Sequence, residues 1–347
     1  MQGIRCIALS AALLSPPASI VQASQATPLY KIVARIPLGS PERWDYASFD
    51  AAGKRIYVAH GDRLTVVDAA KNAVTGQVGT FPGGTHGSAV AEGFHVAYTD
   101  DGKAGIAAAF DPSTMRVLKQ IPAAPDADGI IYDSASRHVF VIDGDSGSIT
   151  VIDPRSNTSV STIKIGAGLE AAVPDGKGKL FIDGAENHDL IAVDTKTNAV
   201  IAHYPLAGCE RPHGIAIDSK TRRVFVTCIN KVMVVVDADK GTNLASLPIG
   251  ASSDGAAFDL RRKYALSSNG EGTLSVVKEV DASHFVKLGD VPTMRSARTI
   301  AIDPASGRIY LPAAEIAKVE RSETPGARPR TTYAPHSLKL LVLEPTN

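Results

Sequence analysis

Residues 213 to 226 read HGIAIDSKTRRVFV, and the fold is decided by how often this pattern returns. A short apolar segment ends in an acidic residue, Asp218, and a turn of Ser, Lys, Thr and Arg follows. A second segment, β-branched and aromatic, then begins at Arg223. Because β-branched and aromatic residues favour strands while Ser and Asp favour turns, the stretch predicts two short strands joined by a tight turn.

The pattern recurs seven times along the chain. Equivalent residues at the end of the first strand are 41 to 44 residues apart, at Asp50, Ala91, Asp133, Asp175, Asp218, Asp259 and Asp303. Each unit continues with a third strand that often ends in Asp and with a fourth strand, as in Ile149–Asp153 and Ser159–Ile163. Four strands at a period of about 40 to 45 residues are typical of a β-propeller. We therefore predict an all-β fold, a seven-bladed β-propeller with four antiparallel strands per blade and little helix.

The two ends of the chain predict how the ring of blades closes. The seventh unit has strands near Thr299–Asp303, Arg308–Leu311 and Ser337–Leu343, and then the sequence stops. Its fourth strand is missing, while Tyr30–Leu38 has fourth-strand character before the first unit. Closure hides strand edges that would otherwise recruit other chains. We therefore expect the N-terminal strand to complete the last blade.

An insertion interrupts the last unit at residues 315–336, between its second and third strands. It is rich in Pro, Arg, Ser and Thr, and Arg321, Arg328 and Arg330 give it local positive charge. Such a segment could be a lid or a docking loop, and the alternative is a disordered excursion. These arginines are the feature that would support a nucleic-acid partner.

The first 26 residues resemble a signal peptide. Arg5 supplies the positive charge, Cys6–Leu14 form a short apolar core, and cleavage after Ala23 or Ala26 satisfies the small-x-small rule. The alternative is a buried N-terminal segment. No later apolar run approaches the roughly 20 residues needed to span a membrane. We therefore expect a periplasmic or secreted protein with one domain at residues 27–347.

Composition limits the partners of this domain. The 36 basic and 36 acidic residues cancel, so there is no overall charge that would favour nucleic acid or an anionic membrane. We expect a monomer. An oxidising compartment would permit a disulfide between Cys209 and Cys228, and the alternative is two unpaired, buried thiols.

The units resemble the YVTN-type β-propeller repeat. That repeat reads aromatic-Val-x-Asn, a turn, then a strand ending in Val-Asp followed by a Val six residues later. The matching segments are Ile56–Ala59 with Val67, Asp68 and Val74, and Val139–Val141 with Ile152, Asp153 and Val160. The repeat's Asn is replaced here by Ala59, Ile142 and Thr227. The resemblance covers essentially the whole chain after residue 26, and its tail resembles exported single-domain members. It implies the propeller architecture, and members of the family are linked to surface layers or DNA binding.

One residue of each unit is placed to face the central channel. The residue five positions before each strand end begins the innermost strand, and all seven are charged or titratable: Asp45, His86, Asp128, Glu170, His213, Asp254 and Arg298. We call these seven residues the channel-mouth ring. His60 and Arg211 are expected on the same face, together with Asp143, Asp183, Cys228 and Asn269 at the ends of second strands.

The ring allows more than one interpretation. It could bind a small ligand, or hold a divalent metal through His86, His213, Asp128 and Glu170, since imidazole and carboxylate suit several metals. Alternatively, a channel mouth is wet and its charges simply neutralise one another. Other Asp residues, such as Asp133 and Asp194, recur in nearly every unit, so we expect them to cap turn amides.

We favour a non-enzymatic binding protein that presents this polar funnel to a small ligand or a protein partner. A metal-dependent lactonase or hydrolase, with the metal in the channel and a carboxylate or His as general base, is the alternative. A third interpretation, single-stranded DNA binding, rests on the family and on the Arg-rich insertion.

Overall fold

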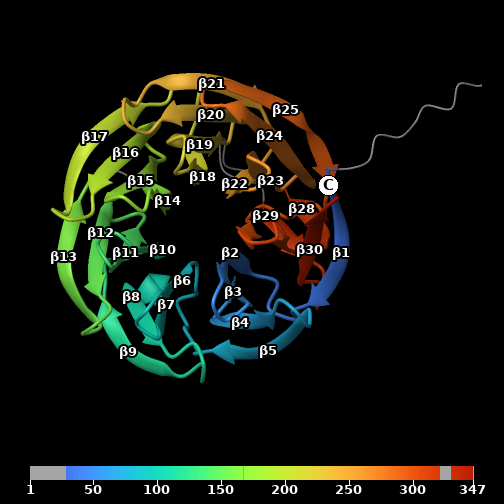
Figure 1. Ribbon diagram of the computed structural model, residues 1–347. Helices are drawn as coiled ribbons and strands as arrows, with labels where there is room; N and C mark the ends of the chain where they lie inside the picture. The colour runs from blue at the N-terminus through green and yellow to red at the C-terminus, as the bar shows by residue number, and fades with distance from the viewer. Residues whose placement is uncertain (1–28, 167, 321–329, 347) are drawn as a thin grey trace, which may run out of the picture.

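The computed structural model describes residues 29–166, 168–320 and 330–346, and these form a ring of seven four-stranded antiparallel sheets (Figure 1). Six sheets follow the chain in order, and the predicted all-β, seven-bladed propeller is confirmed. Among the described residues the only helical segment is a single 3-10 turn at Gly102–Ala104. No helix in that part of the chain is long and apolar enough to cross a membrane.

Each of the first six blades contains four consecutive strands, numbered from the channel outward. Blades one and two are β2 (Trp44–Asp50), β3 (Arg55–His60), β4 (Arg63–Asp68), β5 (Ala73–Val78), β6 (Ser88–Ala91), β7 (Val96–Asp101), β8 (Ile106–Phe110) and β9 (Val117–Pro122). Blades three and four are β10 (Ala127–Asp133), β11 (His138–Asp143), β12 (Ser148–Asp153), β13 (Thr158–Lys164), β14 (Leu169–Pro174), β15 (Lys179–Gly184), β16 (Asp189–Asp194) and β17 (Ala199–Pro205). Blades five and six are β18 (Pro212–Asp218), β19 (Arg223–Cys228), β20 (Val232–Asp237), β21 (Asn243–Pro248), β22 (Ser253–Asp259), β23 (Tyr264–Asn269), β24 (Thr273–Asp281) and β25 (His284–Pro292).

The seventh blade joins the two ends of the chain. Its order is β26 (Ala301–Ile302), β27 (Ile309–Ala313), β30 (Lys339–Pro345) and then β1 (Tyr30–Pro37). β1 pairs antiparallel with β30 from Tyr30 opposite Pro345 to Pro37 opposite Lys339. In Figure 1 the blue N-terminal strand accordingly lies beside the red β30. The predicted closure by the N-terminal strand is confirmed.

The core lies between adjacent blades. Apolar side chains from one sheet pack on those of the next, as where Phe225 of β19 stacks on Phe258 of β22 with ring centroids 5.2 Å apart. Burial of this apolar surface drives the folding of each pair of sheets. The predicted turn-capping role of Asp is also confirmed: Asp133 accepts hydrogen bonds from two turn amides, and Asp194 accepts two others.

The innermost strands approach one another closely. The amide of Tyr46 in blade one donates to the carbonyl of His86 in blade two over 3.0 Å. A Cβ added at Gly87 would lie 2.6 Å from the carbonyl oxygen of Asp128, so this position requires glycine. The ring residues of neighbouring blades are consequently held side by side around the channel.

The described parts of the insertion pair as two strands, which its composition does not indicate, and we call this pair the hairpin. β28 (Ile316–Glu320) pairs with β29 (Arg330–Tyr333), and the ring of Tyr333 lies 4.9 Å from that of Trp44, at the start of β2. The hairpin thus sits at the channel-mouth end. Arg330 is exposed on β29, while Arg321 and Arg328 lie outside the described residues.

Candidate functional site

β-Bulges position five members of the channel-mouth ring. In blades one, three, four, five and six, the pairing of the first two strands shifts at the ring position, as between Trp44 and Ala47 or between Leu169 and Ala172. A bulge leaves a residue out of the ladder and re-aims its side chain. Five of the seven blades therefore carry an irregularity at the position where the charged residues occur.

Arg298 organises one side of the ring. Its Nε donates to Asp254 Oδ2 over 2.7 Å, and its Nη2 donates to the carbonyl of Trp44 over 2.9 Å and lies 4.0 Å from Asp45 Oδ2. The guanidinium also lies 5.1 Å from the centre of the Trp44 ring, which Tyr333 covers from the hairpin. Arg298 thus joins the sixth, seventh and first blades, and its charge is already matched.

His213 lies between two carboxylates on the next side. Its Nδ1 is 3.2 Å from Glu170 Oε1 and 3.6 Å from Asp254 Oδ1. Neither contact has the geometry of a hydrogen bond, and Nε2 is also buried without a partner among the described residues. The side chain is only 5% exposed. Blades four, five and six therefore share a polar cluster whose donors and acceptors are incompletely matched.

His86 forms a separate pair with Asp100 in its own blade. Its Nδ1 lies 2.9 Å from Asp100 Oδ1, and the same carboxylate accepts from the amides of His86 and Gly87. Burial opposes protonation of His86, but the hydrogen bond and charge of Asp100 outweigh it and raise the imidazole pKa to about 9. Burial also raises the pKa of Asp100, while its contact with His86 opposes that shift, so the two side chains are matched chiefly by each other.

The remaining ring carboxyls are short of positive charge. Burial raises the pKa of Asp45 to about 7, with Asp254 adding to the shift and Arg298 opposing it. Burial and the neighbouring Asp45 also raise the pKa of Asp128 well above its usual value. The buried Oδ1 of Asp128 has no hydrogen-bond partner among the described residues. Carboxyl groups that lie close together without enough positive charge nearby favour the protonated form.

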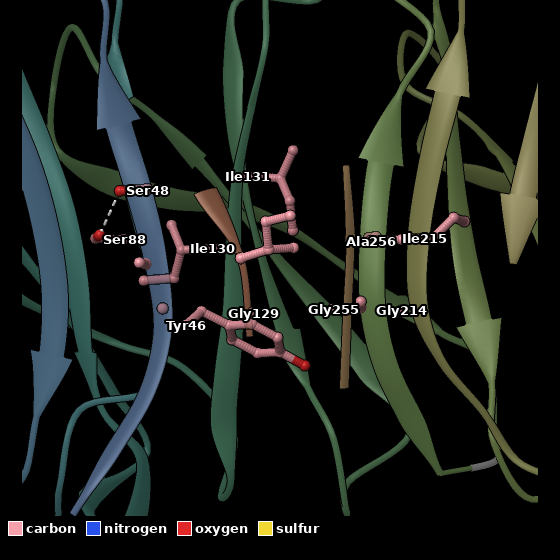
Figure 2. A pocket seen from close by; sticks show the side chains of 15 residues that line it. Tyr46, Ser48, Ser88, Gly129, Ile130, Ile131, Gly214, Ile215, Gly255 and Ala256 are labelled. Atoms are coloured by element: carbon pink, nitrogen blue, oxygen red, sulfur yellow. Dashed lines mark hydrogen bonds between the residues drawn. The ribbon is translucent and has the colours of Figure 1, made fainter. Parts of the chain in front are cut away.

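The channel behind the ring contains a cavity of about 190 Å³. Its wall consists of the next residues of the innermost strands, mostly Gly, Ala and Ile (Figure 2). Figure 2 shows the ring of Tyr46 projecting from β2 into this space. Burial, and then the nearby Asp128, raise the pKa of the Tyr46 phenol well above its usual value, so it remains a hydrogen-bond donor.

Tyr46 and Asp100 were not among the residues predicted for the site. Tyr46 directly follows its ring residue, where the other units carry Gly87, Gly129, Ala171, Gly214, Gly255 and Thr299. A large side chain at a position that otherwise holds a small residue could have identified Tyr46 from the sequence. Asp100 occupies the strand position that corresponds to Asp183, two residues beyond the aromatic of the second strand. The second unit is a weak copy of the repeat, which hid that correspondence.

Two predicted site residues are not gathered into the ring. His60 is buried, its Nδ1 lies 2.7 Å from Thr65 Oγ1, and its Nε2 lies 2.7 Å from the carbonyl of Pro41. Burial lowers the pKa of this imidazole, so it is held neutral. Arg211 precedes β18 and is exposed. The structure therefore places the seven ring residues together around the channel, whereas the side chain of His60 points into blade one.

Other second-strand ends behave like His60. Asp143 accepts from the hydroxyls of Ser148 and Thr150 on the third strand, and Asn269 donates to Thr273 and Ser275. Side chains at this position clamp the second strand to the third strand. Their polarity is therefore structural and not part of the channel surface.

The four metal candidates do not form a ligand set. Within the described residues, no three His, Cys, Asp or Glu side chains gather as a metal-binding group. His86 is paired with Asp100, and His213 contacts only Glu170 among the other candidates.

Cys209 and Cys228 form a disulfide in the fifth blade. It ties the segment before β18 to the end of β19, and Cys228 pairs in register with Pro212, the residue before His213. The bridge therefore fixes the backbone that carries one member of the ring.

Asp183 is the least satisfied carboxyl at this end of the molecule. It is inaccessible to solvent, and both of its oxygens lack a hydrogen-bond partner among the described residues. Burial, together with the charge of Glu170, raises its pKa well above the usual value. An acid whose pKa is raised by folding contributes stability below its unfolded pKa, and this contribution is lost as the pH rises toward the folded value.

We expect Asp183→Asn to stabilise the protein at pH 8, by about 1 to 3 kcal/mol, because the amide removes the cost of ionising a buried carboxyl. At pH 4 to 5 the gain should nearly vanish, since Asp183 is then protonated. Urea unfolding at both pH values measures this. Asp194→Asn in the same blade is the matched control: turn amides lower the pKa of Asp194, so this change should destabilise at neutral pH. A gain for Asp183→Asn that is equal at both pH values would contradict the account.

These features define a class: the chain is a seven-bladed β-propeller with a charged ring at one mouth of its central channel. No family model matches it, and no curated protein matches it in sequence. Kuenenia stuttgartiensis hydrazine synthase is similar in structure, with a TM-score of 0.66 and 16% identity over 78% of this chain and 92% of that chain. A chain of the mitotic checkpoint complex has a TM-score of 0.69 and 13% identity over 97% and 98% of the two chains. At these identities the likeness shows the fold alone.

Proposed function

We propose that this protein is an exported binding protein of the YVTN-type β-propeller family, and that the channel-mouth ring takes up a small ligand. The observation that carries the proposal is the set of buried, unpartnered polar atoms at the mouth of a cavity, on Asp128 and His213. A buried polar group without a partner costs free energy unless a ligand or water satisfies it. Pockets with a few convergent polar groups over an apolar wall are the usual form of small-molecule sites.

The proposal of export rests on one sequence prediction and one structural observation. The signal-peptide prediction falls on residues 1–26, which lie outside the described residues. The Cys209–Cys228 disulfide is consistent with an oxidising compartment, because disulfides persist in secreted and periplasmic proteins and are rare in the cytosol. We therefore propose a periplasmic or secreted location for the binding site.

Thermal unfolding with a panel of small molecules tests the binding proposal. The panel contains ammonium compounds, carboxylates, sugars, nucleotides and the ions Ca²⁺, Mn²⁺ and Zn²⁺. A true ligand should raise the melting temperature of the wild type, since a ligand that binds only the folded state stabilises it. The rise should be lost in Asp128→Asn and Glu170→Gln, which keep side-chain shape but remove a carboxyl group from the ring.

Asp145→Asn is the control, because Asp145 is an exposed carboxylate at the same end, in the turn after β11. A panel in which no compound acts through the ring would refute the proposed function. A ring-dependent response to the divalent ions alone would instead favour the metal-dependent lactonase or hydrolase.

A further inference from the structure

The channel-mouth ring has more acidic groups than cations. The inference drawn below, about the chemical class of its ligand, rests on the proposed function. Four ring members are carboxyls, at Asp45, Asp128, Glu170 and Asp254. Arg298 is committed to Asp254 and to the Trp44 carbonyl, and His86 is committed to Asp100. Beside Glu170 the ring offers only the imidazole of His213, whose Nδ1 lies 3.2 Å from Oε1 without a hydrogen bond, and Asp128 Oδ1 has no hydrogen-bond partner among the described residues.

A comparison of two blades shows the same deficit independently. The register places Asp100 and Asp183 at equivalent positions, beside the ring residue of their own blades. Asp100 receives hydrogen bonds from His86 and two amides, whereas Asp183 faces the bulge that carries Glu170. Asp183 is fully buried with both oxygens unpartnered. The fourth blade therefore has two neighbouring carboxyls where the second blade has a cation and a carboxyl.

The cavity wall indicates the rest of the ligand. Beyond the ring, Ile130, Ile131, Ile215 and Ile300 line the channel together with glycines and alanines. The face of Tyr46 also borders this space (Figure 2). An aromatic face attracts a cation, and an aliphatic wall takes an apolar tail. A cavity of about 190 Å³ leaves room for only a short tail.

We infer that the channel-mouth ring binds the ammonium head of a small primary amine, with the amine's short apolar tail in the channel. Three N–H donors of the head can satisfy Asp128, Glu170 and the ring carboxyls beside them, because an ammonium donates three hydrogen bonds and accepts none. Hydrogen bonds from an ammonium to carboxylates are among the stronger kinds.

Three probes with the same tail isolate the head group: n-butylammonium, n-butanol and n-butyrate. Titration calorimetry at concentrations up to about 10 mM resolves a Kd of about 1 mM. We expect n-butylammonium to bind and the other two to give no ring-dependent signal. Asp128→Asn and Glu170→Gln should each weaken n-butylammonium at least about tenfold, while Asp145→Asn binds as the wild type does. Circular dichroism verifies that each variant is folded.

The affinity should also rise from pH 6 to pH 8. Asp45 is faced by Arg298, Asp254, His86 and Asp100, and Asp128 is faced by Asp45, His86, Asp100 and Glu170. Because burial raises the pKa of Asp45 to about 7, this carboxyl loses its proton over this range, while His86 and the alkylammonium stay charged. A flat or falling profile would contradict the inference.

The outcomes separate the two proposals. Ring-dependent binding of butyrate, or of another anion or sugar in the panel, without binding of n-butylammonium would overturn the amine assignment and leave the binding function in place. Binding of n-butylammonium that is unchanged in both Asp128→Asn and Glu170→Gln would also overturn it. If no compound acts through the ring, both proposals fail together.

Discussion

Tyr30→Ala should destabilise the protein by about 3 to 5 kcal/mol, the usual cost of truncating a buried aromatic side chain. Tyr30 is 1% exposed at the start of β1 and packs with Leu343 and Val291 in one core cluster. Its hydroxyl donates to Asp259 Oδ2 over 3.3 Å, so it links the strand that closes the ring to the sixth blade. The variant should lose this contact and leave a cavity at the closure.

Val33→Ala on the same strand is the matched control. Val33 is 40% exposed, and an exposed substitution of this kind changes stability by about 0.5 kcal/mol or less. Urea unfolding of both variants measures the difference in midpoint at a common slope. Equal midpoints for Tyr30→Ala and the wild type would mean that β1 does not close the ring in solution.

The fold was predictable because a propeller is periodic. Once Asp218 and its equivalents fix the phase, each unit predicts four strands, and the strand missing after Leu343 predicts the role of Tyr30–Pro37. The hairpin of β28 and β29 had no such support. It occurs once, outside the repeat, and its position depends on the contact between Tyr333 and Trp44, which only the folded chain provides.

The site was predictable in outline but not in its contacts. The phase of the sequence repeat predicted that the seven ring residues lie together, because equivalent positions in successive blades meet around the propeller axis. Phase also placed His60 at that end of its blade, yet its side chain turns toward Thr65. The direction of a side chain depends on bulges and on hydroxyl partners of the next strand, which vary from blade to blade. Tyr46 shows the converse, because it reaches the channel at a position where four of the other blades have glycine.

Loss of the Cys209–Cys228 disulfide should destabilise the protein by about 3 kcal/mol, because the bridge restricts an unfolded loop of 19 residues. Both residues are buried in the core cluster between the fourth and fifth blades, so the pair Cys209→Ala and Cys228→Ala keeps apolar contacts while removing the bond. Chemical unfolding with and without reductant measures the effect. Reductant should lower the midpoint of the wild type and leave that of the double variant unchanged.

The same change tests whether the bridge supports the ring. Because Cys228 pairs with Pro212, freeing it should loosen the backbone before His213, beside Glu170 and Asp254. We therefore expect reduction to weaken any ring-dependent ligand as well as the fold, and to do so at temperatures where the protein is still fully folded. A ligand whose affinity is the same in oxidised and reduced protein would show that the bridge stabilises the fifth blade alone.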